Sequence, residues 1–319
     1  MDIVAELGGS HGGDFKRAIA LIDTARACGA THVKFQTFKP EQLAADVVVQ
    51  GGPWAGQRYR DLYMQTYLPW DWHAELFAYA KSLGLVPFSS AFSEEAVDFL
   101  ETIGCAMYKI ASPEITHLNL IRYAATTGKP VILSTGCATW EVVEDAIEQC
   151  EEAVTVLHCV SSYPAKASDY KLQWLKELIY TNVGVSDHTQ DVTLATVAAA
   201  LDCNMIERHL TLTTHLPDDC FASRPEQFKA MTEAVRQVEA MNGMVLPPSQ
   251  QAKEYMRCIW TTTPIKAGEL VTRANVAVLR PYREGSFSPT AMAHLTSGDI
   301  RATRDIEANT ALSWTDLNV

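Results

Sequence analysis

The chain has 319 residues, of which 47 % are hydrophobic, and a formal net charge of −12. This length suits a barrel of about 250 residues with an appended domain, and the apolar content excludes a disordered chain. The negative charge and the lack of any Lys/Arg cluster argue against nucleic acid as a partner, and no apolar run reaches the ~18 residues of a membrane span. Because the first residues lack the basic segment of a secretory signal and the eight cysteines occur singly, we expect a cytoplasmic protein with free thiols, mostly in the core.

Short β-branched runs alternate with amphipathic segments as far as about residue 242. The predicted helical segments include residues 15–28, 72–83, 94–103 and 192–201, and the predicted strands are residues 3–6, 33–37, 86–89, 107–110, 131–134, 154–158, 183–186 and 205–209. Eight strand–helix alternations predict an α/β fold, a (β/α)8 TIM barrel, over residues 1–242. An open doubly wound sheet is the alternative, but no G-x-G-x-x-G motif follows the first strand.

The segment of residues 39–68 is too long for an ordinary connection and predicts a functional loop. The aromatic side chains of residues 53–72 are expected to pack rather than to form a stacking platform, and we place this segment as a lid over the barrel mouth.

The pattern changes after residue 242. Residues 243–256 contain Pro247 and Pro248 and predict a linker, and residues 257–319 are rich in strand and turn signals. Two stretches in this region resemble each other, one beginning at Ile265 and the other at Ile306. This repeat predicts a small β-rich domain with pseudo-symmetry, which is too short to have much core of its own and should lean on another surface.

Active sites of such barrels lie at the C-terminal ends of the strands. Every predicted strand carries polar residues there: Glu6; Lys34 and Gln36; Ser89 and Ser90; Lys109 and Ser112, with Glu114 beyond; Ser134 and Gly136; His158 and Tyr163; Ser186 and His188; Glu207 and His209. A purely structural barrel would not need polar residues at all eight ends.

Lys34 and Lys109 lie among apolar neighbours, where an ammonium group must find a partner. One interpretation is an internal salt bridge with Glu6 or Glu207. The other is a cradle for phosphate and carboxylate groups, formed together with the serines at the neighbouring strand ends.

His188 and His209 follow neighbouring strands, which run about 5 Å apart, so both imidazoles can reach one metal ion. With Asp, Glu and water nearby, Mn²⁺ or another borderline divalent ion is expected. His158 is interpreted as a core residue. Glu6 and Glu207 are open to two interpretations, as a general base and acceptors for substrate hydroxyls, or as partners of the lysines and Arg208.

Taken together, these motifs resemble the sialic acid synthase family over essentially the whole chain. The stretches that carry the resemblance are Ala5-Glu6-Leu7-Gly8, Val33-Lys34-Phe35-Gln36, Tyr108-Lys109-Ile110-Ala111-Ser112, Leu133-Ser134-Thr135-Gly136, Tyr163-Pro164-Ala165, Ser186-Asp187-His188-Thr189 and Glu207-Arg208-His209-Leu210. Within the family the strongest likeness is to pseudaminic acid synthases, through Tyr67-Leu68-Pro69-Trp70 and the segment from Asp218 to Phe228. The tail, with Ile265-Lys266-Ala267-Gly268-Glu269 and Leu279-Arg280-Pro281, is similar to the family's antifreeze-like (SAF) domain.

The resemblance implies an enzyme that condenses phosphoenolpyruvate with an amino sugar such as 2,4-diacetamido-2,4,6-trideoxy-L-altrose or N-acetylmannosamine, giving a nine-carbon sialic-type acid and phosphate. It implies that phosphoenolpyruvate is held by Lys34, Lys109, Ser112, Ser134, Gly136, Tyr163 and Ser186. It implies Mn²⁺, with Mg²⁺ or Co²⁺ as alternatives, on His188 and His209, and the sugar on Glu6, Gln36, Tyr163, Asp218 and Arg280. Glu6, Glu114 and His209 would be catalytic, and Arg280 would reach the partner's barrel in a domain-swapped homodimer.

Three stretches depart from the family pattern. Ser10 stands where the first loop usually has Asn, Pro217-Asp218-Asp219 replaces Pro-Asp-His, and Tyr282-Arg283-Glu284-Gly285 replaces a glycine-rich turn. Because these departures lie on the sugar side, N-acetylneuraminate and legionaminate synthases are alternatives. A Schiff-base aldolase using Lys109 or Lys34 and a non-catalytic sugar-binding barrel are further alternatives.

Overall fold

The computed structural model describes residues 1–150, 154–177, 182–243 and 246–319. The chain forms two compact units, Met1–Gly243 and Met244–Val319. Within the described residues no helix combines the length and the apolarity needed to cross a lipid bilayer.

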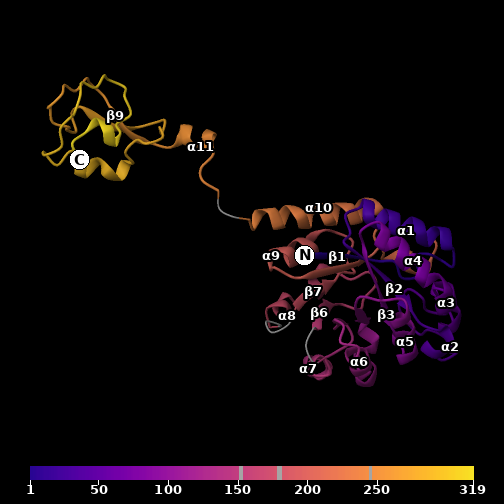
Figure 1. The fold of residues 1–319 in the computed structure, drawn as a ribbon. Coiled ribbons are helices and arrows are strands. Elements are labelled where there is room, and N and C mark those ends of the chain that lie inside the picture. The colour runs from indigo at the N-terminus through magenta and orange to yellow at the C-terminus, as the bar shows by residue number, and fades with distance from the viewer. Residues whose placement is uncertain (151–153, 178–181, 244–245) are drawn as a thin grey trace. The chain divides into compact units, whose positions relative to one another are not determined.

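The first unit is the predicted barrel (Figure 1). All pairings between neighbouring strands are parallel, and the last strand pairs with the first, with Asp2 opposite Met205 and Glu6 opposite His209. The closed order is β1 (Asp2–Glu6), β2 (His32–Thr37), β3 (Val86–Ala91), β4 (Tyr108–Ile110), β5 (Val131–Ser134), β6 (Val154–Cys159), β7 (Asn182–Ser186) and β8 (Met205–His209). The (β/α)8 prediction is therefore confirmed and the open sheet is excluded.

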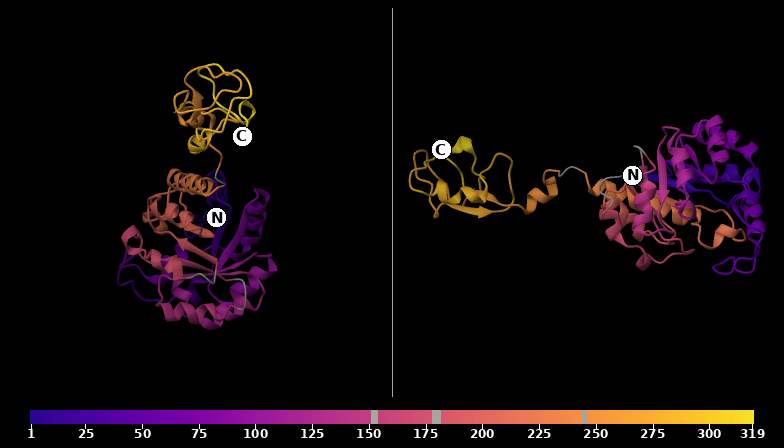
Figure 2. Two further views of the ribbon diagram at one scale, coloured as in Figure 1. Left: turned by 90° about the vertical axis from the view of Figure 1, so that its left-hand side faces the viewer. Right: turned by 90° about the horizontal axis from the view of Figure 1, so that it is seen from below.

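Helices follow most strands and surround the barrel, as the views in Figures 1 and 2 show. Asp14 begins the first helix by accepting hydrogen bonds from the backbone amides of Lys16 and Arg17, and the buried Leu21 and Ile22 face the strands. The helices of this unit are α1 (Phe15–Ala27), α2 (Pro40–Leu43), α3 (Tyr59–Thr66), α4 (Trp70–Ser82), α5 (Glu94–Thr102), α6 (Leu118–Ala125), α7 (Trp140–Ile147), α8 (Leu172–Glu177), α9 (Thr193–Ala200) and α10 (Pro225–Met241).

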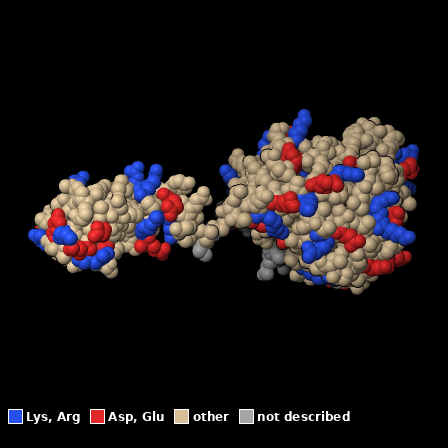
Figure 3. All heavy atoms as spheres, turned by 90° about the horizontal axis from the view of Figure 1, so that it is seen from above, with Lys and Arg blue, Asp and Glu red and all other residues tan. Residues whose placement is uncertain are grey.

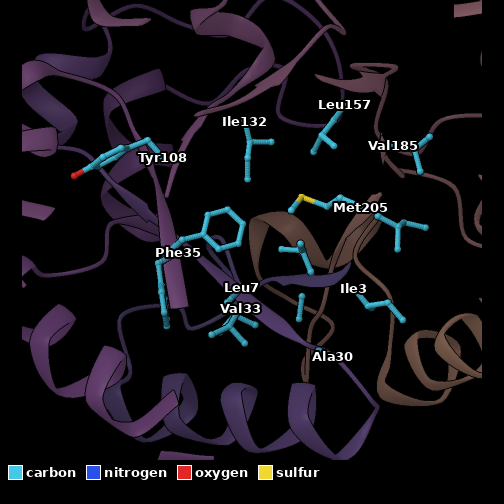
Figure 4. Packing of buried hydrophobic residues seen from close by; sticks show 14 of the residues in the cluster. Ile3, Leu7, Ala30, Val33, Phe35, Tyr108, Ile132, Leu157, Val185 and Met205 are labelled. Carbon is cyan, nitrogen blue, oxygen red and sulfur yellow. The ribbon is translucent and has the colours of Figure 1, made fainter. Parts of the chain in front are cut away.

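Buried apolar side chains from successive strands fill the space within the barrel and beneath its helices (Figure 4). Close packing is evident at Gly184 on β7, where an added Cβ atom would lie 2.2 Å from the Met205 carbonyl oxygen and 2.7 Å from Leu157. Only glycine fits there, so β7 and β8 can approach closely just below the strand ends.

The segment of residues 39–68 contains secondary structure, contrary to the prediction of a long loop. It contains α2 and α3, and between them Val48 and Arg58 form an antiparallel bridge that closes a hairpin-like strap (residues 44–58). Its tip carries Trp54, whose indole nitrogen donates a hydrogen bond to the Pro217 carbonyl at 3.1 Å. The tip of the strap therefore lies against the loop that follows β8.

The second unit comprises α11 (Gln250–Tyr255), β9 (Cys258–Thr261), β10 (Val276–Leu279) and α12 (Met292–Leu295), with an antiparallel β9–β10 pair. Helix α11 lies within the residues predicted to be linker, where the Ser249 side chain accepts a hydrogen bond from the amide of Ala252 and begins the helix.

The predicted pseudo-symmetry is confirmed in this unit. Ile265 and Ile306 exchange backbone hydrogen bonds across the repeat. Three residues later in each half, Gly268 and Asn309 both have left-handed backbone (φ 82° and 59°), which Gly and Asn adopt most readily. The repeated sequence therefore encodes one turn twice.

Candidate active site

A cavity of about 240 Å³ opens where the barrel strands end. Strand ends and the loops that follow them contribute its lining residues: Lys34, Gln36, Trp54, Tyr63, Ser90, Phe92, Lys109, Ala111, Ser112, Pro113, Glu114, Ser134, Cys159, Tyr163, Ser186, His188, Glu207, His209, Asp218 and Phe221. The structure thus brings together most of the residues that the sequence singled out.

Two lysines form the floor of this cavity and are almost completely buried. The Lys34 ammonium group lies 2.8 Å from Glu6 Oε2 and 3.6 Å from Glu207 Oε2. It also donates a hydrogen bond to Ser90 Oγ at 2.9 Å. Lys109 lies 3.9 Å from the same Glu207 oxygen. The salt-bridge interpretation is therefore confirmed, and both lysines also line the cavity.

Burial opposes charge on Glu207, but the ammonium groups of Lys109 and Lys34 outweigh it and lower the pKa of Glu207 to about 2. Burial also lowers the pKa of Lys109, an effect that Glu207 only partly offsets. The pKa of Lys34 is raised instead, because Glu207 and Glu6 together outweigh its burial. The floor is thus a compact set of charges. Within it, the nearby carboxylates neutralise the ammonium group of Lys109 less fully than that of Lys34.

Hydroxyl groups from three strand ends surround the lysines. Ser134 and Ser186 lie within hydrogen-bond distance of each other, at 2.8 Å, and Ser186 donates to Glu207 at 3.3 Å. The amide of Gly136 donates to Ser112 Oγ at 3.0 Å. A Cβ atom at Gly136 would lie 2.3 Å from Ser161 Oγ, so this turn accepts no side chain. Lysine ammonium and serine hydroxyl groups in one pocket are groups that bind phosphate and carboxylate oxygens, whereas the Gly136 amide is taken up by Ser112.

The two predicted metal ligands lie side by side at the ends of β7 and β8, with ring centroids 5.7 Å apart. His188 Nδ1 lies 2.8 Å from the Val160 carbonyl oxygen, which leaves Nε2 as the free nitrogen. His209 Nδ1 is buried without a hydrogen-bond partner and lies 3.7 Å from Asp218 Oδ2. Among the described residues, no group of three or more His, Cys, Asp or Glu side chains is arranged to hold a metal ion. A metal ion bound by these two imidazoles would have to take further ligands from substrate or water.

The sugar-side residues adjoin this pair. Gln36 donates a hydrogen bond to Glu6 Oε1 at 2.7 Å, and the amide of Gly9 donates to Asp218 Oδ2 at 2.8 Å. Tyr163 packs against His188 with ring centroids 4.4 Å apart. Gln36, Tyr163 and Asp218 thus line the cavity, whereas Glu6 is fully buried and contacts Gln36 and Lys34.

Glu114 belongs to the short 3-10 helix Ser112–Glu114, beyond β4. Its Oε2 atom is buried without a hydrogen-bond partner. Burial raises the pKa of Glu114 to about 7, against the opposing effect of Lys109. A carboxyl group that titrates near neutrality is suited to accept a proton from water.

A second chamber of about 480 Å³ adjoins the first, and we call it the vestibule. It shares Gln36, Trp54, Tyr63, Tyr163 and Asp218 with the inner cavity. The prediction that the aromatic residues of this region pack is confirmed for Trp54, which lies 5.8 Å from the Tyr163 ring, and for Trp70, which stacks on Phe99 at 4.7 Å. Trp54 and Tyr63 also line both chambers.

Several other predicted residues lie elsewhere. His158 faces away from the cavity, stacks on Trp174 and accepts a hydrogen bond from the amide of Lys171, which confirms that it is a core residue. The prediction of buried cysteines is wrong for Cys137 and Cys220, which are exposed. Arg280 is exposed in the second unit, where it donates a hydrogen bond to the Tyr255 carbonyl at 2.7 Å.

The chain is similar to several known proteins. The model of the NeuB family matches residues 21–246, and that of the SAF domain matches residues 257–318. The chain is 35 % identical to a pseudaminic acid synthase of Helicobacter pylori, over 99 % of this chain and 97 % of the relative. It is 31 % identical to an N,N'-diacetyllegionaminic acid synthase of Campylobacter jejuni, over 88 % of this chain and 90 % of the relative. The crystal structure of an N-acetylneuraminic acid synthetase of Leptospira borgpetersenii superposes with a TM-score of 0.70 at 27 % identity, covering 79 % of this chain and 89 % of that chain.

Proposed function

The chain belongs to the NeuB family, and we propose that it condenses phosphoenolpyruvate with an acetamido hexose to form a nine-carbon acid of the pseudaminic type, with release of phosphate. The acceptor in this proposal is 2,4-diacetamido-2,4,6-trideoxy-L-altrose. N-acetylneuraminate or legionaminate synthesis is the alternative, because relatives with those activities resemble the chain at lower identity.

The observation that carries the proposal is the pair of buried lysines over Glu207. Phosphoenolpyruvate has a carboxylate and a phosphate on one small carbon frame, and two cations with several hydroxyls match it. Lys34, Lys109, Ser112, Ser134, Gly136, Tyr163 and Ser186 are the residues that we assign to this ligand.

His188 and His209 would hold a divalent metal ion, Mn²⁺ in this proposal with Mg²⁺ or Co²⁺ as alternatives, which when bound supplies Lewis acidity at the acceptor aldehyde. The sugar is held by Glu6, Gln36, Tyr163 and Asp218, so that its aldehyde carbon lies beside carbon 3 of phosphoenolpyruvate. A new bond then forms between these two carbons as the π bond of the aldehyde carbonyl breaks. The aldehyde oxygen takes up a proton to become a hydroxyl group, and positive charge develops at carbon 2 of the former phosphoenolpyruvate.

Glu114 takes a proton from the water that adds at carbon 2, giving a tetrahedral intermediate that expels phosphate by C–O cleavage. Lys34 and Lys109 stabilise the negative charge of the departing phosphate. Glu6 accepts hydrogen bonds from the acceptor and is the second candidate for proton transfer.

A phosphate-release assay with phosphoenolpyruvate, Mn²⁺ and a panel of acetamido hexoses tests the proposal. Release should require both substrates and should vanish in Lys109→Met. No release with any hexose would reject it, and trapping of a pyruvate adduct by borohydride would indicate a Schiff-base aldolase instead.

We further propose that the protein works in the cytoplasm as a domain-swapped homodimer in which Arg280 completes the sugar site of the partner. Its guanidinium group is exposed, and such a group can bind a carboxylate or acyl oxygen in bidentate fashion. Mixing Arg280→Ala subunits with His209→Ala subunits should restore roughly one quarter of wild-type activity, because about half of the dimers are mixed and each has one whole site. If subunits exchange and no activity returns, Arg280 does not act in the partner's site.

A further inference from the structure

His188 lies beyond the last paired residue of β7. The ladders between β7 and its two neighbours end at Ser186, which is opposite Cys159 on β6 and Glu207 on β8. The amide of Asp187 still donates a hydrogen bond to the Glu207 carbonyl oxygen at 2.8 Å. His188 comes after the end of both ladders, so the place of its imidazole depends on groups outside the sheet.

A single side-chain oxygen supports the backbone on both sides of Asp187. The Tyr170 hydroxyl group donates a hydrogen bond to the Ser186 carbonyl oxygen at 2.8 Å and accepts one from the His188 amide at 3.0 Å. A phenolic hydroxyl can donate and accept at the same time, so one oxygen serves both backbone groups. Because Tyr170 is 5 % exposed, loss of its hydroxyl would leave the buried His188 amide without this partner.

Tyr170 is itself held by packing outside the cavity. Its ring lies edge-to-face on His158 with centroids 5.4 Å apart, and His158 stacks on Trp174 at 5.6 Å. The His158 Nε2 atom accepts a hydrogen bond from the amide of Lys171, the residue next to the tyrosine, at 3.1 Å. Tyr170 is not one of the described residues that line the inner cavity. It can therefore act on a substrate only through the residues that it contacts.

The two residues that share this hydroxyl differ in how much else holds them. Ser186 is paired with a strand on each side. The other contacts of His188 are the Ala165 amide, which donates to its carbonyl oxygen at 3.0 Å, and the Val160 carbonyl oxygen at its ring. Both of these partners belong, like Tyr170, to the segment that follows β6. Loss of the hydroxyl should therefore displace His188 more than Ser186.

We propose that Tyr170 is a positioning residue, whose hydroxyl sets the place of the His188 imidazole relative to the phosphoenolpyruvate residues at the end of β7. The inference rests on the proposed synthase function and adds to it a residue that touches neither substrate. In that function His188 serves the acceptor aldehyde, whereas Ser186 and its neighbours bind phosphoenolpyruvate. The hydroxyl should thus support turnover without supporting the binding of phosphoenolpyruvate.

Tyr170→Phe tests this inference, because it removes the hydroxyl and keeps the ring that packs on His158. With 2,4-diacetamido-2,4,6-trideoxy-L-altrose and Mn²⁺, we expect the kcat of phosphate release to fall about tenfold or more, since a misplacement of about 1 Å can cost about 100-fold. The KM for phosphoenolpyruvate should stay unchanged, which is the split expected of a group that acts after this substrate has bound. In calorimetry, the affinity for Mn²⁺ should fall about tenfold, because one of its two imidazoles is displaced.

Tyr79→Phe is the matched control. The Tyr79 hydroxyl donates a hydrogen bond to Asp23 at 2.6 Å and links α4 with α1, and Tyr79 lies outside the set of described residues that line the inner cavity. This variant should change neither kcat, nor the KM for phosphoenolpyruvate, nor the affinity for Mn²⁺. Thermal unfolding of both variants sets an assay temperature at which each is folded, so that a lower kcat cannot reflect lost protein.

The outcomes separate this inference from the function on which it rests. If Tyr170→Phe and Tyr79→Phe behave alike, the Tyr170 hydroxyl does not position His188. If kcat and the affinity for phosphoenolpyruvate fall together, the hydroxyl supports the end of β7 as a whole, and the inference is wrong. In both cases the wild type still releases phosphate and the synthase function stands. If the wild type releases no phosphate with any acetamido hexose, the proposed function fails, and equal Mn²⁺ affinities of the two variants would then reject the Tyr170 inference as well.

Discussion

Replacing Lys34 with Met should destabilise the barrel strongly at neutral pH. Lys34 is 3 % exposed and is the only lysine or arginine within ion-pair distance of Glu6 among the described residues. In the variant, the buried carboxylates of Glu6 and Glu207 would share the single ammonium group of Lys109. Breaking a buried ion pair from one side typically costs about 3–5 kcal/mol, because a charge stays buried without its partner.

The pKa of Glu207 indicates the scale of the stabilisation that Lys109 and Lys34 together provide. It falls from 4.5 to about 2 because two lysines outweigh its burial, and such a shift corresponds to about 3 kcal/mol in the free energy of unfolding. This contribution is present above pH 4.5 and is lost as the pH falls toward 2. Wild-type stability should therefore change little through Glu207 between pH 8 and pH 5.

The variant should behave differently over the same range. Without Lys34, burial favours a protonated carboxyl group, so the free energy of unfolding should rise as the pH falls from 8 toward 5. Urea unfolding at both pH values measures the difference from wild type, which should be larger at pH 8.

Lys39→Met is the control, because Lys39 pairs with Glu95 at the surface and should contribute less than about 1 kcal/mol. The charged floor described above would be refuted if Lys34→Met lowered the free energy of unfolding no more than the control does. It would also be refuted if the loss of unfolding free energy were equal at the two pH values.

Three further predictions concern activity and ligand binding. If Glu114 is the base, kcat/KM should rise with pH through an apparent pKa near 7, and Glu114→Gln should abolish that limb of the pH profile. Phosphoenolpyruvate at 100 times its Kd should stabilise the wild type by about 2.7 kcal/mol in thermal unfolding, and Lys109→Met should remove this gain; a retained gain would make Lys109 purely structural. EDTA should abolish turnover and Mn²⁺ restore it, while His209→Ala should lose metal affinity in calorimetry and nearly all activity but little stability; full turnover in chelated enzyme would contradict the metal assignment.

Much of the barrel could be predicted because its strands are short apolar runs with polar ends. The eight predicted strands agree with the structure to within two residues at each end. The charged floor was also foreseeable, since Lys34 and Lys109 stand in apolar surroundings where only a partner can hold them. The sequence does not show which carboxylate pairs with each lysine. That pairing depends on closure of the barrel, which places the first strand, β1, beside the last strand, β8.

The vestibule could not be predicted for a related reason. Trp54 reaches Pro217 only because the strap folds back over the loop after β8, and no periodic pattern marks that contact. Glu207 was visible at a strand end but remained ambiguous, since its role depends on two lysines from other strands. The local sequence pattern can predict to which side of a strand a side chain points. Its ion-pair and hydrogen-bond partners depend on contacts between residues far apart in the chain.

Successive residues at the ends of β7 and β8 alternate between positions that line the cavity and positions that do not. Ser186 and Glu207 are paired in register, and together with His188 and His209 they line the cavity. The intervening Asp187 and Arg208 do not line it.

Those two intervening residues are 1 % and 2 % exposed and form a buried ion pair with each other. Arg208 also donates a hydrogen bond to the Asp191 carbonyl oxygen. Because successive residues of a strand point to opposite faces, this pair ties the ends of β7 and β8 together behind the cavity. Each member directly precedes one histidine, so the pair restrains the spacing of the two imidazoles without contacting a ligand. A charged residue inside a functional motif can thus serve the geometry of the site while taking no part in its chemistry.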